Sequence, residues 1–186
     1  MGGISGIVNV GGAVDDGDAR ALGSGPRFRA PGAIFVARPR STLAHNEQFA
    51  VMVAGHFDRA PATGQSAAEV VLDGWHRSGM GVFSQVEGAW VAAVYERATE
   101  KLTLVRDPFG VRRLFWSTHG NRLAFASGMR ALLEVPGVSR ELARENLAEF
   151  LSFRYVHAPR TLLRDVRALP PGHMVTVEPG RPPRVE

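Results

Sequence analysis

The chain has 186 residues, the length of one large domain or of one domain with a tail. Apolar residues make up 45% of it, and the basic residues that give its net charge of +4 are scattered among acids. This composition disfavours disorder and a basic nucleic-acid-binding patch. The apolar runs are too short to cross a bilayer, and no secretory signal is visible, so we expect a cytoplasmic protein.

The first half of the chain predicts strands separated by turns and one helix. Short apolar runs predict strands over Gly2–Val10, Ala33–Arg38 and Gln48–Ala54. Between the first two, Gly11–Pro31 is rich in Gly, Asp and Ala and predicts a loop with one short helical turn. Ser66 and Glu69 have the spacing of a capping box, so a helix is expected to begin there and to present Trp75 on its apolar face.

Further along, alternating patterns predict two antiparallel hairpins. These pair Gly88–Tyr95 with Leu102–Arg106, and Leu114–Ser117 with Leu123–Ala126. A short helix is predicted over Met129–Glu134, and a longer one over Arg140–Phe150 with Ser139 as its N-cap. Many antiparallel strands with few helices predict an α+β layered sandwich.

From Ala158 onward the chain changes in composition. Six prolines interrupt it, at positions 159, 170, 171, 179, 182 and 183, with one short strand predicted over His173–Val177. We therefore expect residues 1–157 to form the folded domain and residues 158–186 to form a proline-rich linker or docking tail.

Several stretches resemble the asparagine synthetase family. Residues 106–115 read RDPFGVRRLF and are followed by Phe125-Ala126-Ser127, similar to the family pattern RDPFGxKPLYY … FASE. Residues 147–161 read LAEFLSFRYVHAPRT and residues 169–173 read LPPGH, similar to LAEYLSFGYVPAPRT … LPPGH. The opening MGGISGIV is similar to the family start MCGIAGI.

The resemblance implies the N-terminal glutaminase-type domain of that family, a class II glutamine amidotransferase domain. It also implies an Ntn-type αββα sandwich, with two antiparallel sheets between helical layers. In active members, a cysteine exposed by removal of the initiator Met attacks the amide of glutamine, and its own amino group serves as base. The released ammonia travels to a second domain that activates a carboxylate with ATP.

This chain departs from the family at the residues that carry the chemistry. It contains no cysteine, and Gly2 stands at the nucleophile position. The family's NGE segment, which stabilises the oxyanion, falls on Ala54-Gly55-His56, where Ala54 offers no donor. The family's aspartate for the substrate amino group falls on Ala67. The sequence thus predicts no catalytic residue and no glutaminase activity.

Other polar residues have structural interpretations. The family's RGPD motif is missing from this chain. Arg27, Arg29 and Arg38 lie in the region, but none of them can be assigned to the arginine of that motif. His56 could act as a base and Ser5 as a hydrolase nucleophile, but hydrogen-bonded structural roles are favoured for both. The other histidines lack metal-ligand spacing, and no phosphate loop is present. Asp107 is expected to accept hydrogen bonds from backbone amides in its turn.

The function expected is that of a non-catalytic subunit or fragment. It would support an asparagine-synthetase-like, ATP-dependent amide ligase on another polypeptide, as in β-lactam synthetases and lasso-peptide cyclases, whose glutaminase half has lost its cysteine. ATP and Mg would belong to that partner, with no cofactor, nucleic acid or membrane bound here. The expected interface residues are Arg112, Arg113, Tyr155, Leu162, Leu163, Val166 and Leu169. The alternative is a free-standing module that binds a small ligand or regulates through the emptied pocket.

Overall fold

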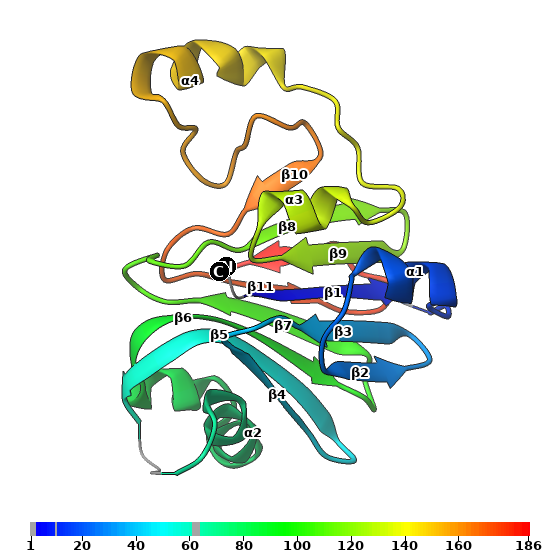
Figure 1. Cartoon of the computed structure of the whole chain (residues 1–186), viewed down its shortest axis with the longest axis vertical. Helices are drawn as coiled ribbons and strands as arrows, with labels where there is room; N and C mark the ends of the chain where they lie inside the picture. The colour runs from blue at the N-terminus through cyan, green and yellow to red at the C-terminus, as the bar shows by residue number, and fades with distance from the viewer. Residues whose placement is uncertain (1–2, 10, 61–63) are drawn as a thin grey trace.

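The computed structural model describes residues 3–9, 11–60 and 64–186 as a layered sandwich (Figure 1). Two six-stranded antiparallel sheets pack face to face, and short helices cover their outer faces. The predicted α+β sandwich of αββα type is confirmed. No helix within the described ranges is long and apolar enough to span a membrane.

The first sheet has the strand order β10-β8-β9-β1-β3-β2. Its strands are β1 (Ile4–Asn9), β2 (Arg27–Ala30), β3 (Ala33–Ala37), β8 (Phe115–His119), β9 (Arg122–Ala126) and β10 (Val166–Ala168). Because side chains alternate along β1, Ile4 and Val8 face the second sheet while Ile7 faces outward. The outer face is covered by α1 (Asp16–Ala21) and α3 (Met129–Leu133).

The second sheet has the strand order β12-β11-β7-β6-β5-β4. Its strands are β4 (Ser41–His45), β5 (Phe49–Arg59), β6 (Glu87–Glu96), β7 (Lys101–Arg106), β11 (Met174–Val177) and β12 (Arg184–Val185). Its outer face is covered by α2 (Ala67–Ser78) and the 3-10 helix η1 (Gly79–Gln85). As predicted, α2 begins with a capping box: Ser66 Oγ accepts from Glu69 N (3.3 Å) and Glu69 Oε2 from Ser66 N (2.7 Å).

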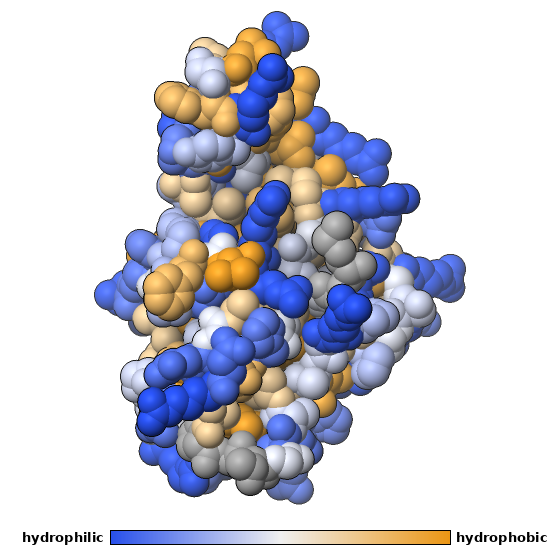
Figure 2. All heavy atoms as spheres, turned by 60° about the vertical axis from the view of Figure 1, so that its left-hand side comes forward, coloured by the Kyte–Doolittle hydropathy of each residue, from blue (hydrophilic) through white to orange (hydrophobic). Residues whose placement is uncertain are grey.

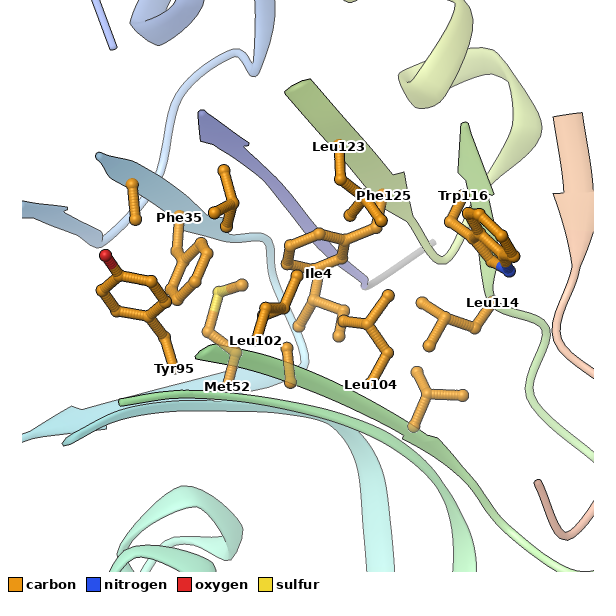
Figure 3. Close-up of a cluster of buried hydrophobic side chains, with 14 of the residues drawn as sticks. Ile4, Phe35, Met52, Tyr95, Leu102, Leu104, Leu114, Trp116, Leu123 and Phe125 are labelled. Atoms are coloured by element: carbon orange, nitrogen blue, oxygen red, sulfur yellow. The ribbon is translucent and has the colours of Figure 1, made fainter. Parts of the chain in front are cut away.

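The largest core lies between the two sheets (Figure 3). Phe35 stands edge-on to both Tyr95 and Phe125, with ring centroids 5.7 and 5.6 Å apart. A Cβ atom at Gly6 would lie 2.6 Å from ring atoms of Phe35 and Phe125. Glycine at this position of β1 therefore allows the aromatic rings to fill the space between the sheets.

Residues 158–186 belong to the sandwich. β10 pairs with β8 in the first sheet, and β11 pairs with β7 in the second. The expected division at residue 157 and the expected linker are therefore wrong, because the prolines mark turns between paired strands. Val166 and Leu169 are 1% and 0% exposed, so neither is available as the interface residue that was expected.

Three local expectations also need correction. The predicted loop Gly11–Pro31 contains β2, and β4 was not predicted. In place of a helix over Arg140–Phe150, the chain forms the 3-10 helix η2 (Arg144–Asn146) and α4 (Leu147–Phe153). The residues before η2 stay extended because Ala143 N donates to Leu162 O (2.9 Å) and Leu142 forms a β-bridge with Leu163.

Residues 139–165, called the arm below, project from the first sheet and carry α4 (Figure 1). Glu149 joins the two sides of the arm: it accepts from His157 N (2.9 Å) and pairs with Arg160 Nη2 (2.8 Å). The hydrogen bonds from the His157 backbone and side chain hold the pKa of Glu149 below its ordinary value. The Glu149 carboxylate therefore stabilises the arm at pH values above the ordinary pKa of a glutamate. This stabilisation is lost as the pH falls through the lowered pKa of Glu149.

Arg106 and Asp107 organise the loop that follows β7. Arg106 is 9% exposed and donates to the carbonyls of Gly110 (2.6 Å), Arg112 (2.6 Å) and Leu169 (2.5 Å). Burial lowers the pKa of its guanidinium. The group nonetheless stays protonated, because arginine does not lose its proton in proteins. Asp107 is fully buried and accepts from the amides of Phe109, Val111 and Arg112 at 3.0 to 3.4 Å. The predicted turn role of Asp107 is confirmed.

The buried position of Leu169 yields a stability prediction. Leu169→Ala should lower the free energy of unfolding by about 2–5 kcal/mol, because it leaves a cavity between the sheets. Leu151→Ala, at a side chain that is 68% exposed, is the matched control and should change it by less than about 0.5 kcal/mol. Urea unfolding measures both. Equal midpoints for the two variants would contradict the placement of Leu169 in the core.

Asp107→Ala should lower the free energy of unfolding by about 1–3 kcal/mol, because three backbone amides lose their acceptor. Asp107→Asn retains one side-chain oxygen, so its free energy of unfolding should lie between those of the wild type and the alanine variant. Thermal and urea midpoints measure the effect, with the exposed Asp165→Ala as control. An unchanged midpoint for Asp107→Ala would contradict the structural role.

Candidate functional site

The start of β1 is where the family resemblance places the nucleophile. Gly2 lies outside the described residues, and Gly3 is the first residue that the structure describes there. The carbonyl of Gly3 accepts from Arg38 N and lies 2.8 Å from Ser41 Oγ. The connection from β3 to β4 therefore passes directly beside Gly3.

The oxyanion position lies on β5, next to the same connection. Ser41 is paired with Ala54 in the β4–β5 register, and Ala54 is fully buried in the core between the sheets. Gly55 has a φ of +123°, and a Cβ there would lie 2.0 Å from Ala89 O. Backbone geometry alone requires glycine at this point, so its presence does not indicate catalysis.

The third position begins α2. Ala67 is the first residue of that helix, and Ala68 N donates to Thr42 Oγ1 (3.0 Å). Thr42 directly follows Ser41, so the segments that carry Gly3, Ala54 and Ala67 meet around the first two residues of β4. The structure thus brings the described positions together, and they present only glycine and methyl groups. Gly3, Ala54 and Ala67 themselves carry no side-chain nucleophile, amide or carboxylate.

Two serine hydroxyls beside this site were not singled out from the sequence. Ser41 Oγ contacts Gly3 O, and Ser127 Oγ accepts from Ile4 N (3.0 Å). A Cβ at position 3 would lie 2.1 Å from Ser127 Oγ, so any other residue there would displace that hydroxyl. Ser127 ends the Phe125-Ala126-Ser127 motif, which was the one available signal. The two hydroxyls contact the backbone of Gly3 and of Ile4, the residues at which β1 begins.

His56 and Ser5 do not form a hydrolase site. The side chain of His56 is 61% exposed, and its Nε2 lies 3.3 Å from Asp58 Oδ1 at the solvated surface. Ser5 is fully buried between β3 and β9, and its hydroxyl has no hydrogen-bond partner among the described residues. Neither side chain has the nucleophile–histidine–carboxylate arrangement of a triad.

The three arginines near the missing motif have different surroundings. Arg27 donates to Gly23 O (2.8 Å), and Arg29 forms an exposed ion pair with Asp16 (2.8 Å). Arg38 alone adjoins the site, and it does so through its backbone, since its guanidinium donates to Leu22 O (3.0 Å) at the end of α1. Among the residues that the structure describes, no group of three His, Asp or Glu side chains could hold a metal ion.

Comparison with known proteins agrees with this geometry. Residues 56–183, more than half of the chain, match the family described as "Glutamine amidotransferase domain". The putative glutamine-hydrolyzing asparagine synthetase of Mycobacterium bovis is 35% identical over 107 residues, which cover 56% of this chain and 16% of that protein. Asparagine synthetase 1 of Bacillus subtilis is 29% identical over 114 residues, which cover 61% of this chain and 18% of that protein. The chain thus spans less than a fifth of the length of these relatives.

Solved structures show the same fold. The allosteric regulatory enzyme of purine biosynthesis superposes with a TM-score of 0.63 at 15% identity, over 99% of this chain and 48% of that one. Glutamine phosphoribosylpyrophosphate amidotransferase from Bacillus subtilis gives a TM-score of 0.55 at 16% identity, over 99% and 42%. Together with the sequence match, these likenesses establish that the chain belongs to the glutamine amidotransferase domain family and is related to the N-terminal glutaminase-like domain of asparagine synthetases.

Proposed function

We propose that this chain is a glutaminase-like domain without glutaminase activity, and that it supports an ATP-dependent, amide-forming synthetase on another polypeptide. The observation that supports the proposal is the set of residues around the start of β4, where Ala54, Gly55 and Ala67 are the residues that the family resemblance assigns to the oxyanion and substrate positions. The absence of cysteine from the whole sequence adds to it. Loss of a single oxyanion donor costs about 10²–10³ in rate, and here several groups are missing together.

A scaffold without chemistry can still serve a ligase. If the amine to be acylated is part of the substrate, ammonia from glutamine is unnecessary. The glutaminase half is then needed only as a folded domain against which the synthetase packs. ATP and Mg would then be bound by the partner synthetase. The alternative, a free-standing module that binds a small ligand in the emptied site, has less support, because the side chain at position 54 is packed within the core.

The proposal predicts that the purified chain does not hydrolyse glutamine. A coupled glutamate assay and a direct ammonia assay measure this, with asparagine synthetase 1 of Bacillus subtilis as positive control. Glutamate release should stay at the level of a buffer blank at every concentration of the chain. Release that rises in proportion to the amount of chain would overturn the proposal.

Restoring the nucleophile alone should also fail. Gly2→Cys supplies a thiol but leaves Ala54 without a donor and Ala67 without a carboxylate, and residues that act as a unit are strongly non-additive. We expect glutamine turnover at least about 10²-fold below that of the Bacillus subtilis enzyme. Gly2→Ala is the control, and mass spectrometry checks that the initiator Met has been removed, so that residue 2 is the N-terminal residue. Turnover comparable to the active relative would mean that Ala54 and Ala67 do not stand at the catalytic positions.

A further inference from the structure

Helix α4 is an apolar helix that the rest of the described chain covers only in part. Its seven residues include Leu147, Phe150, Leu151 and Phe153, and none of its residues is buried. Leu151 is 68% exposed and Phe153 is 60% exposed. A helix this short gains its stability from packing rather than from its own hydrogen bonds. Its composition therefore indicates a surface that is covered in the working protein.

A second apolar group stands on the loop over residues 107–113. The Arg106–Asp107 network fixes this loop from inside and leaves Phe109 and Val111 at 85% and 65% exposure. A rigid loop that presents a phenyl ring to solvent is typical of a recognition surface, since aromatic side chains are enriched in the cores of interfaces. The loop and α4 thus offer two exposed apolar groups.

A groove of about 620 Å³ joins the two groups. The arm contributes Phe150, Tyr155 and Leu162 to its wall, and the 107–113 loop contributes Gly110 and Arg113. Figure 2 shows apolar residues gathered over the α4 end of the molecule. The groove, together with the exposed residues of α4 and of the 107–113 loop, is called the arm groove below.

The arm groove carries positive charge. Arg113 lines it and Arg154 ends α4; both are exposed, and neither forms an ion pair within the ranges that the structure describes. The nearby carboxylate of Glu149 is already occupied by His157 and Arg160. The arm groove therefore has cations free to meet carboxylates from outside.

Arg154 is held at a backbone conformation that favours glycine. Its φ is +63° at the end of α4, and the resembling motif LAEYLSFGYVPAPRT has glycine at this point. An arginine here carries a conformational cost that glycine would not, and such strain is typical of positions that serve recognition. The contacts within the fold thus do not explain an arginine at position 154, and recognition of a partner would.

We propose that the arm groove docks the synthetase partner of the proposed function, through an apolar ridge on that partner flanked by carboxylates. The inference rests on the proposed function and names the surface that serves it. A second copy of this chain is a poor occupant, because two positively charged grooves would face each other and repel. Five of the seven expected interface residues keep this role: Arg113, Tyr155, Leu162 and Leu163 line the groove, and Arg112 adjoins Arg113 in the 107–113 loop. Val166 and Leu169 are buried and have no part in this surface, whereas Phe109, Leu151 and Phe153 are exposed and are added to the proposed interface.

Photo-crosslinking in the native host tests the assignment. A benzophenone amino acid replaces Phe109 or Phe153 in the full chain, and Met80, which is 37% exposed on η1 beside the other sheet, is the matched control site. Crosslinks from positions 109 and 153 should join peptides of a synthetase domain that contain apolar residues next to Asp or Glu. Position 80 should give none. Crosslinks from 109 and 153 to another copy of this chain, or no crosslinks, would overturn the docking proposal.

Binding to the captured synthetase, purified separately, then measures the contribution of each side chain. Phe153→Asp should weaken the complex at least about 30-fold, the range of an interface hot spot, while Met80→Asp should leave it unchanged. Arg113→Glu should slow association and reduce its dependence on salt. Thermal midpoints check that every variant is folded. Tight binding that none of the groove variants affects would refute the arm groove but keep the proposed function, whereas absence of any synthetase complex would refute both.

Discussion

The two sheets approach each other across β1, where Gly6 leaves its space to the rings of Phe35 and Phe125. Any larger side chain at this point would separate the sheets or displace an aromatic ring, because protein interiors are close-packed. Since β1 is paired on both edges, by β3 and by β9, its position also fixes where the β3–β4 connection and the end of β9 can lie. The architecture of the candidate site follows from this one packing constraint.

The same constraint explains how the site would keep its shape without glutaminase chemistry, as the proposed function requires. Gly55 is required by its φ and by the backbone at Ala89. This glycine would be needed in an active enzyme and in an inactive scaffold alike. Side chains that only contact a substrate face no such requirement, and Ala54 and Ala67 are the positions where the chain carries plain methyl groups. Fold and catalysis thus place demands on different residues of the same site.

The sequence predicted the elements whose signals are local. The capping box at Ser66 and the turns of the two hairpins fix α2, β6, β7, β8 and β9 over short distances along the chain. It missed β4 and β10, whose polar or very short segments become strands only through partners elsewhere in the sheet. The meeting of Gly3, Ala54 and Ala67 has no local signal either, and it was available only through the family resemblance. The covered state of Leu169 depends on contacts with Leu114, more than fifty residues away.

The placement of β10, β11 and β12 also bears on how the protein folds during synthesis. β10 forms one edge of the first sheet, and β11 with β12 completes an edge of the second. Until residues 166–185 have left the ribosome, β8 and β7 each present an unpaired backbone edge, which is a template for aggregation. The nascent chain therefore cannot close either sheet gradually as it emerges. It must hold two incomplete sheets until one late segment protects both, a task for which chaperone protection is expected.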